Sequence, residues 1–195
     1  DVIAVLLDVH RLVDGASFVN LALHDADARV LRLNVPSHVD GEVADRWAIL
    51  PLEGVPPTPL SDAFLGGRPV YVRGPADRRA RYPHLEPDVE TVGVTATAAL
   101  PLTGEDGRPI GALGVAWAAP VDLGPSLVAR LDLVADLCAQ ALQRARRTDA
   151  TSALVAKLQD ELLSGVVAPE GLDVAVAYRP GGLLGFGGDW YDVVP

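Results

Sequence analysis

The sequence predicts an α+β domain in which one antiparallel sheet is backed by helices and followed by a long helix. Three observations predict this class. Residues 94–118 form two β-type runs around a short turn that contains glycine. Residues 127–162 carry apolar side chains at helical spacing. In residues 172–178 a large apolar residue or tyrosine occupies every second position, as in a strand. This alternation predicts that a different segment begins after the long helix.

The N-terminal part of the chain predicts a helix, two strands and a second, shorter helix. Residues 2–13 are densely apolar with helical spacing, and Gly15 follows as a left-handed cap. Residues 16–35 predict two strands joined by a polar turn at 24–29. Residues 41–47 have the composition of a short helix.

The central part predicts one capped helix, one strand and an irregular connection. Thr58 and Pro59 have the chemistry of an N-cap and a first helical residue, and Gly66 and Gly67 end the helix that they start. The next residues, "RPVYVR", predict a short strand. Residues 74–87 mix Pro, Arg and Asp, and we expect them to form an irregular connection.

The long helix begins at Gly124-Pro125 and has a possible restart at Thr148-Asp149. Its apolar or small residues follow a three–four spacing, interrupted only near Gln159, at Leu127, Leu131, Val134, Cys138, Ala141, Ala145, Thr148, Ser152, Val155 and Leu162. That spacing fits a helix that pairs with a copy of itself, so we predict a homodimer through this helix.

Composition restricts the classes of partner. Sixteen basic and twenty-six acidic residues give a net charge of −10, which argues against nucleic acid and against an anionic membrane surface. No apolar run reaches the length of a membrane span, and the first residues lack the basic stretch that precedes the apolar run of a signal sequence. The single cysteine, Cys138, fits a reducing compartment, and we expect a cytoplasmic protein. Because the sequence lacks methionine, we expect a fragment or a trimmed product.

The residues with metal-binding or nucleophilic chemistry are few and scattered. His24, His38 and His84 fall in predicted turns or loops, and His10 falls in the first helix, without the spacing of a metal site. We interpret them as surface or loop residues. Cys138 lies on the apolar face of the long helix, where a buried and inert thiol is expected.

Two sets of side chains are compatible with a small-molecule pocket. The aromatic residues fill either a core or such a pocket, and they are Trp47, Phe64, Tyr71, Tyr82 and Trp117. The cluster Arg78, Arg79 and Arg81 is interpreted first as solvated loop charge, with contact to an anionic ligand as the alternative.

The phrases "PTPLSDAFLGGRPVYV" and "ATAALPLTGEDGRPIGALGVAW", followed by the long helix, resemble a GAF sensor domain. The resemblance covers residues 1–147. It implies a six-stranded antiparallel sheet, with helices on one face and a ligand pocket formed by loops and small helices on the other. The ligand is not identified by any sequence signature.

The C-terminal phrases "LQDELL" and "GLDVAVAYRPGGLLGFGGDWYDVV" resemble the opening of a stage II sporulation E-type phosphatase of the metal-dependent PPM class. In that family the aspartate of the Gly-Gly-Asp phrase ligates one of two Mn²⁺ or Mg²⁺ ions, and the matching residue is Asp189. Asp192 receives no ligand role. By this resemblance residues 148–166 are a helical linker and residues 167–195 are the start of a phosphatase domain.

The resemblance implies a parent enzyme that removes phosphate from serine or threonine of a regulatory protein, an anti-sigma-factor antagonist. The chain itself is expected to hold no metal and to be inactive, because one carboxylate is too few for a hard cation. Apolar residues of the tail are expected to pack elsewhere than in a complete enzyme, namely Leu172, Val174, Val176, Tyr178 and Trp190. The alternatives are a stand-alone small-molecule-binding module and a pure dimerisation module.

Overall fold

The structure is a computed structural model that describes residues 13, 15–34 and 41–163, with side chains described as far as residue 147. The chain divides into two units, residues 1–142 and 143–195. The first unit contains the sheet and the cavity described below. The predicted helix at 2–13 and the tail after residue 163, with Asp189 and Asp192, lie outside the described residues, apart from Val13.

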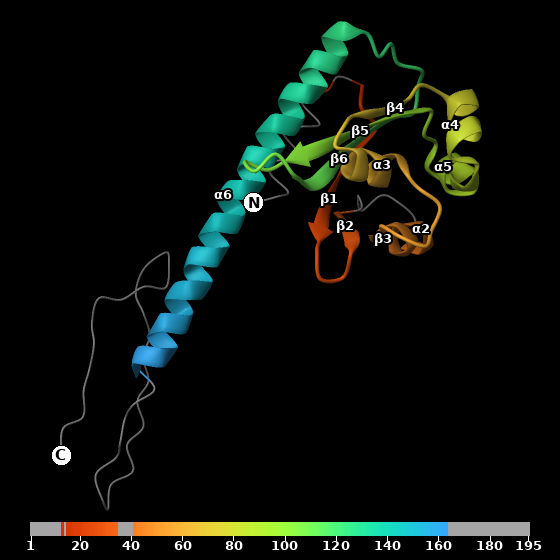
Figure 1. The fold of residues 1–195 in the computed structure, drawn as a ribbon. Helices are drawn as coiled ribbons and strands as arrows, with labels where there is room; N and C mark the ends of the chain where they lie inside the picture. The colour runs from red at the N-terminus through yellow and green to blue at the C-terminus, as the bar shows by residue number, and fades with distance from the viewer. Residues whose placement is uncertain (1–12, 14, 35–40, 164–195) are drawn as a thin grey trace, which may run out of the picture. The chain divides into compact units, whose positions relative to one another are not determined.

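A six-stranded antiparallel sheet forms the centre of the first unit, in the order β3-β2-β1-β6-β5-β4 (Figure 1). The strands are β1 (Phe18–Asp25), β2 (Val30–Asn34), β3 (Ile49–Pro51), β4 (Val70–Val72), β5 (Ala96–Thr103) and β6 (Pro109–Trp117). The predicted α+β class is therefore confirmed, and so is the six-stranded antiparallel sheet. The edge strand β3 was not predicted, because three residues that end in proline carry no alternating signal.

Two hairpins match the predicted turns. Arg29 adopts a φ of 55° where β1 turns into β2, and the Oδ1 of Asp25 accepts a hydrogen bond from the amide of Ala28 at 3.0 Å. The β5–β6 turn contains Gly107 with a φ of 77°, a conformation that favours glycine. Both connections follow from turn chemistry that is legible in the sequence.

The helix α3 (Pro59–Gly66) begins and ends as predicted. Thr58 and Ser61 form a reciprocal capping box: the amide of Ser61 donates to the Oγ1 of Thr58 at 3.1 Å, and the amide of Thr58 donates to the Oγ of Ser61 at 2.8 Å. Gly67 ends the helix with a φ of 58°. The predicted short helix at residues 41–47 is α2 (Gly41–Trp47).

The prediction of an irregular connection over residues 74–87 was wrong. The structure has α4 (Pro75–Arg81), the 3₁₀ turn η1 (Pro83–Leu85) and α5 (Glu86–Val92). Each of the three elements carries proline in its first turn, where the missing amide hydrogen has no helical partner to lose. Three arginines in the last turn of α4 and acidic residues in the first turn of α5 also complement the helix dipoles.

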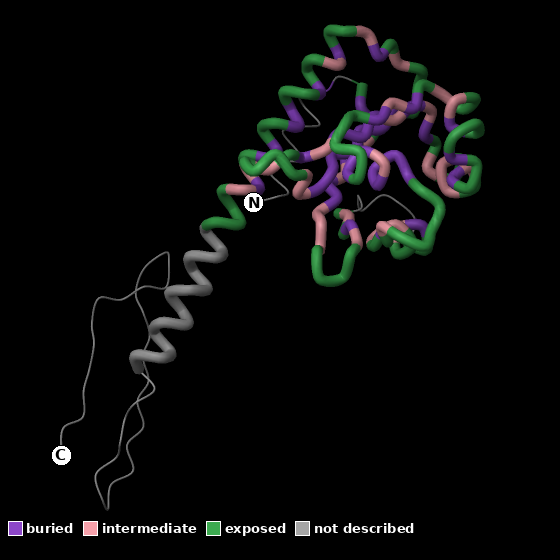
Figure 2. The backbone as a smooth tube through the Cα atoms, viewed as in Figure 1, coloured by how far each residue is buried: buried purple, intermediate pink, exposed green. Residues whose placement is uncertain are grey.

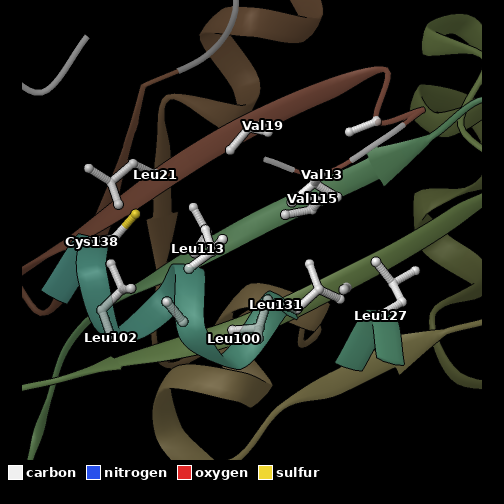
Figure 3. Packing of buried hydrophobic residues seen from close by; sticks show 14 of the residues in the cluster. Val13, Val19, Leu21, Leu100, Leu102, Leu113, Val115, Leu127, Leu131 and Cys138 are labelled. Carbon is white, nitrogen blue, oxygen red and sulfur yellow. The ribbon is translucent and has the colours of Figure 1, made fainter. Parts of the chain in front are cut away.

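One face of the sheet packs against the helix α6 (Pro125–Leu163). Figure 3 shows Leu127, Leu131 and Cys138 of this helix directed at side chains of the strands. Leu131 is fully buried and Cys138 nearly so. The buried residues of this face come mainly from alternate positions of β1, β5 and β6, such as Leu21, Leu100 and Leu113. The alternation places the other side chains of these strands on the opposite face.

The opposite face carries a second apolar cluster, built on α3 and the short elements after it. Ala63 and Phe64 of α3, Tyr82 and Leu85 lie in this cluster. The hydroxyl of Tyr82 donates to the Oδ2 of Asp62 at 2.7 Å, and burial together with this bond raises the pKa of Tyr82 to about 12. Figure 2 shows buried residues along the central strands, in α3 and along the first half of α6.

The helix α6 runs without interruption through Thr148 and Asp149, so no restart occurs at that point. Within residues 125–142 the predicted apolar stripe packs on the sheet of its own chain. This contact buries Leu127, Leu131, Val134 and Cys138, so these residues do not form an interface between two chains. Leu133 and Leu137 are exposed instead, at 59% and 48%. None of the helices formed by the described residues combines the length and apolarity needed to traverse a lipid bilayer.

Candidate ligand-binding cavity

A cavity of about 110 Å³ lies on the face of the sheet opposite α6. Its lining combines side chains of the central strands with side chains of α2, the start of α3, α5 and the residues before α5. Most of this lining is apolar, including Val43, Leu60, Val89 and Val92. A concave, apolar site with a few polar groups is the usual form of a small-molecule site.

The central strand β6 forms the floor of the cavity with small residues, which leave space above the strand. Gly114 and Ala116 of β6 line the cavity, and they are paired with Asn20 and Phe18 of β1. A Cβ atom on Gly114 would lie 1.9 Å from the Oδ1 of Asn20, which is an impossible contact. Glycine at 114 therefore creates the space that the side chain of Asn20 occupies.

The Oδ1 of Asn20 is buried and has no hydrogen-bond partner in the structure. Two other buried side-chain atoms share this property among the described residues, the hydroxyl of Tyr71 and the Nε1 of Trp117. Neither of these residues lines the cavity, whereas Asn20 does. Because an unpaired buried acceptor is costly, an acceptor on a residue that lines a cavity is a suitable partner for a ligand.

Arg78 lines the cavity as a charge that already has partners. Its Nε lies 2.6 Å from the Oε1 of Glu86, and its Nη1 donates to the carbonyls of Val94 and Thr95 at 3.1 and 3.3 Å. The hydrogen bond from Arg78 is the main reason why the pKa of Glu86 lies below its usual value. The guanidinium thus joins α4, α5 and the two residues before β5 at the wall of the cavity.

Asp88 of α5 is the second charged residue of the lining, and it too is paired. The indole Nε1 of Trp47 donates to its Oδ2 at 2.8 Å, and the Nη2 of Arg46 lies 3.3 Å from its Oδ1. These contacts connect α2 to α5, although 41 residues separate Trp47 from Asp88 in the sequence. The cavity is therefore bordered by two neutralised ion pairs.

The predicted arginine cluster is divided in the structure. Arg78 is buried and structural, so its interpretation as solvated loop charge was wrong. Arg79 also contacts Glu86, through its Nε at 3.1 Å, but its side chain is mostly exposed. Arg81 donates to the carbonyl of Tyr71 at 2.8 Å and lies outside the cavity lining.

The aromatic residues are divided in the same way. Trp47 lines the cavity, whereas Phe64 and Tyr82 belong to the core beside it. Tyr71 and Trp117 contribute to the core on the α6 face. The sequence allowed either a core or a pocket for this set, and the structure uses both.

Two histidines, His24 and His84, and the cysteine Cys138 lie apart from the cavity lining. His24 belongs to β1 and not to a turn, and its ring lies 4.6 Å from that of Phe64. His84 lies in η1, while His10 and His38 fall outside the described residues. Cys138 is buried as predicted, and burial raises the pKa of its thiol to about 11. In the described part of the chain no group of three His, Cys, Asp or Glu residues is placed to hold a metal ion.

Sequence reasoning missed Asn20 and Gly114, which define the polar point of the cavity. One signal was present, because asparagine and glycine are both depleted in strand interiors. Asn20 stands in the run "SFVNLAL", and Gly114 stands in "GALGVAW". The pairing of β1 with β6 that brings them together is not visible in either run alone.

Solved structures of similar fold include GAF domains of several different proteins. The GAF domain of a two-component sensor histidine kinase from Bacillus halodurans is 14% identical, with a TM-score of 0.59 over 75% of this chain and 94% of that one. The second GAF domain of DevS from Mycobacterium smegmatis is 18% identical, with a TM-score of 0.55 over 77% and 99%. At these identities the similarity concerns the fold.

A third similar structure is the GAF domain of a phosphoenolpyruvate-protein phosphotransferase from Acinetobacter, 13% identical with a TM-score of 0.54 over 74% of this chain and 81% of that one. The comparison with curated proteins gives no match. The family model of the GAF domain matches residues 3–143, which include the whole sheet and the cavity. This chain therefore belongs to the GAF domain family, the regulatory sensor modules of signalling proteins.

Proposed function

We propose that this chain is the sensory part of a bacterial, cytoplasmic protein serine/threonine phosphatase of the metal-dependent PPM class. The GAF domain binds a small molecule in its cavity and α6 transmits occupancy to the segment that follows. The substrate of the parent enzyme is a phosphorylated regulatory protein, an anti-sigma-factor antagonist. The observation that carries the sensory part of this proposal is the position of β6 between the cavity and α6.

The strand β6 presents its two faces to the two sites that a sensor has to connect. Gly114 and Ala116 form part of the cavity floor. Leu113, Val115 and Trp117, which alternate with them, belong to the core that includes α6. Since a packed core transmits small displacements, a ligand that moves β6 also changes the packing of α6.

The phosphatase part rests on the phrase "GLDVAVAYRPGGLLGFGGDWYDVV" and its resemblance to the first strands of a PPM domain. Asp189 is the residue that would contribute to a site for Mn²⁺ or Mg²⁺, the ions that activate water in this class. It lies outside the described residues.

Two simpler functions share parts of this account. The cavity favours a stand-alone small-molecule-binding module as the second candidate.

We also propose that the protein is a homodimer, and the observation in favour is the apolar pair Leu133 and Leu137, exposed one helical turn apart on α6. If the protein forms this dimer but binds no small molecule, its function is that of a dimerisation module.

The test of the phosphatase proposal uses the reading frame continued past Pro195. We expect an Asp-Gly motif downstream and Mn²⁺-dependent removal of phosphate from a phosphoserine anti-sigma-factor antagonist. Asp189→Asn should abolish this turnover, and Asp192→Asn is the matched control that should retain it. A frame without the motif, or turnover that survives Asp189→Asn, would contradict the proposal.

A further inference from the structure

We infer that the cavity selects an uncharged, mostly apolar molecule of one ring or similar size that donates a single N–H or O–H hydrogen bond to the Oδ1 of Asn20. This inference rests on the proposed sensory function, because it names the class of ligand for the same cavity. Three properties of the cavity support it: its volume, the pairing of its charged groups and its unpaired acceptor.

The volume of the cavity restricts the ligand to a small one. At about 110 Å³ it is slightly smaller than an apolar cavity of ~150 Å³, which accommodates benzene. The wall is formed by side chains such as Val43, Leu60 and Val92. A planar ring or a short branched chain fills such a space, whereas a nucleotide exceeds it.

The charged groups at the cavity wall favour a neutral ligand. The guanidinium of Arg78 is paired with Glu86, at 2.6 Å. The carboxylate of Asp88 is paired with Arg46 and with the indole of Trp47. An ionic ligand would have to break one of these pairs or enter an apolar space without a counter-ion, and either event is costly.

The unpaired acceptor defines the polar end of the ligand. Asn20 lies on the floor beside Gly114, and its Oδ1 is buried without a partner. Placing an O–H or N–H against this oxygen removes the cost of an unsatisfied acceptor. A site with an unpaired polar group also rejects an isostere that lacks the complementary group, so the contact supplies selectivity as well as affinity.

The sequence offers an unusually clean test, because Asn20 and Asn34 are its only two asparagines. Protein that is labelled with ¹⁵N at asparagine side chains alone gives two amide pairs in a heteronuclear NMR spectrum. Asn34 is exposed at the end of β2 and serves as the internal control. The probes are phenol and toluene, which have nearly the same size and differ in the O–H donor.

We expect phenol to shift the amide pair of Asn20 in a saturable manner and to leave that of Asn34 in place. Toluene should occupy the cavity with a much smaller shift at Asn20. In calorimetry, Asn20→Leu should reduce the preference for phenol over toluene by about fivefold or more, because it removes the acceptor. The matched variant Asn34→Leu should leave this preference unchanged.

The outcomes separate the inference from the proposed function. If both probes bind and neither the Asn20 resonance nor Asn20→Leu distinguishes them, the donor requirement is wrong while a sensory cavity remains. If neither probe binds the unmodified protein, the inferred class of ligand is wrong, and the sensory function then requires a ligand of another class. The NMR comparison is made on the unmodified chain, so it tests the donor requirement even if Asn20→Leu does not fold.

Discussion

The Nε of Arg78 lies 2.6 Å from the Oε1 of Glu86, and the arginine side chain of this pair is buried. The same guanidinium satisfies the carbonyls of Val94 and Thr95. One side chain thus fixes α4, the start of α5 and the approach to β5 around the cavity. A residue in a segment rich in proline and arginine therefore has a structural role that its exposed neighbour Arg79 does not share.

Arg78→Ala should lower the free energy of unfolding by about 3 kcal/mol, because it removes the donor to the Oε1 of Glu86 and to the carbonyls of Val94 and Thr95. Arg79→Ala is the matched control, since it contacts the same carboxylate from an exposed position. Its effect should be below about 1 kcal/mol. Urea unfolding of both variants measures the difference, and equal losses would contradict the assignment of the structural role to Arg78.

The stability of the protein should fall in acid partly through Glu86. The hydrogen bond from Arg78 lowers the pKa of Glu86 from its usual 4.5. The stability due to the ionised carboxylate is therefore complete above pH 4.5 and is lost as the pH falls through the lower pKa of the folded state. Glu86→Gln should flatten this dependence in urea unfolding at a series of pH values. A wild-type slope in Glu86→Gln would contradict the linkage.

Gly114→Ala should lower both stability and ligand affinity, because its Cβ would lie 1.9 Å from the Oδ1 of Asn20. The expected loss of stability is about 2 kcal/mol, as for other overpacked sites. The double variant Asn20→Ala/Gly114→Ala removes the clash and should recover part of the loss. A thermodynamic cycle over the two changes measures this coupling, and strictly additive effects would mean that the two side chains do not compete for space.

An aspartate at Leu131 and an aspartate at Leu133 of α6 should have different effects on stability. Leu131 is fully buried against the sheet, so Leu131→Asp should unfold the domain or cost more than about 4 kcal/mol. Leu133 is exposed, so Leu133→Asp should change the stability of the domain by less than about 0.5 kcal/mol. If the protein is a dimer through this face, Leu133→Asp should instead release monomers in sedimentation equilibrium. A wild-type protein that is monomeric at micromolar concentration would refute the dimer.

The sequence predicted the elements whose signal is local and periodic. The hairpin of β5 and β6, the capping of α3 and the position of α6 follow from alternation, turn residues and three–four spacing. The expectation of an irregular connection over residues 74–87 is wrong because the prolines there occupy the first turns of short helices, where proline is tolerated. The first part of the stripe on α6 packs on the sheet of its own chain, and spacing alone does not distinguish such a sheet from a second helix.

The candidate cavity was harder to predict than the fold. It depends on which residues of five strands lie side by side, and the pairing of Asn20 with Gly114 is a matter of register between β1 and β6. The contact of Trp47 with Asp88 likewise joins residues that are distant in sequence. Such contacts arise only in the tertiary structure. By contrast, the chemistry of Trp47 alone made it a candidate pocket residue.

The central claim is that the cavity and α6 are coupled through β6, and hydrogen exchange followed by mass spectrometry tests it most directly. With saturating phenol, amides of β1, β6 and α5 should exchange more slowly, and so should those of residues 127–142 of α6, which pack on the far face of β6. Asn20→Leu at the same phenol concentration should show a weaker effect in every segment. Slower exchange that is confined to the elements lining the cavity, with residues 127–142 unchanged, would contradict the coupling.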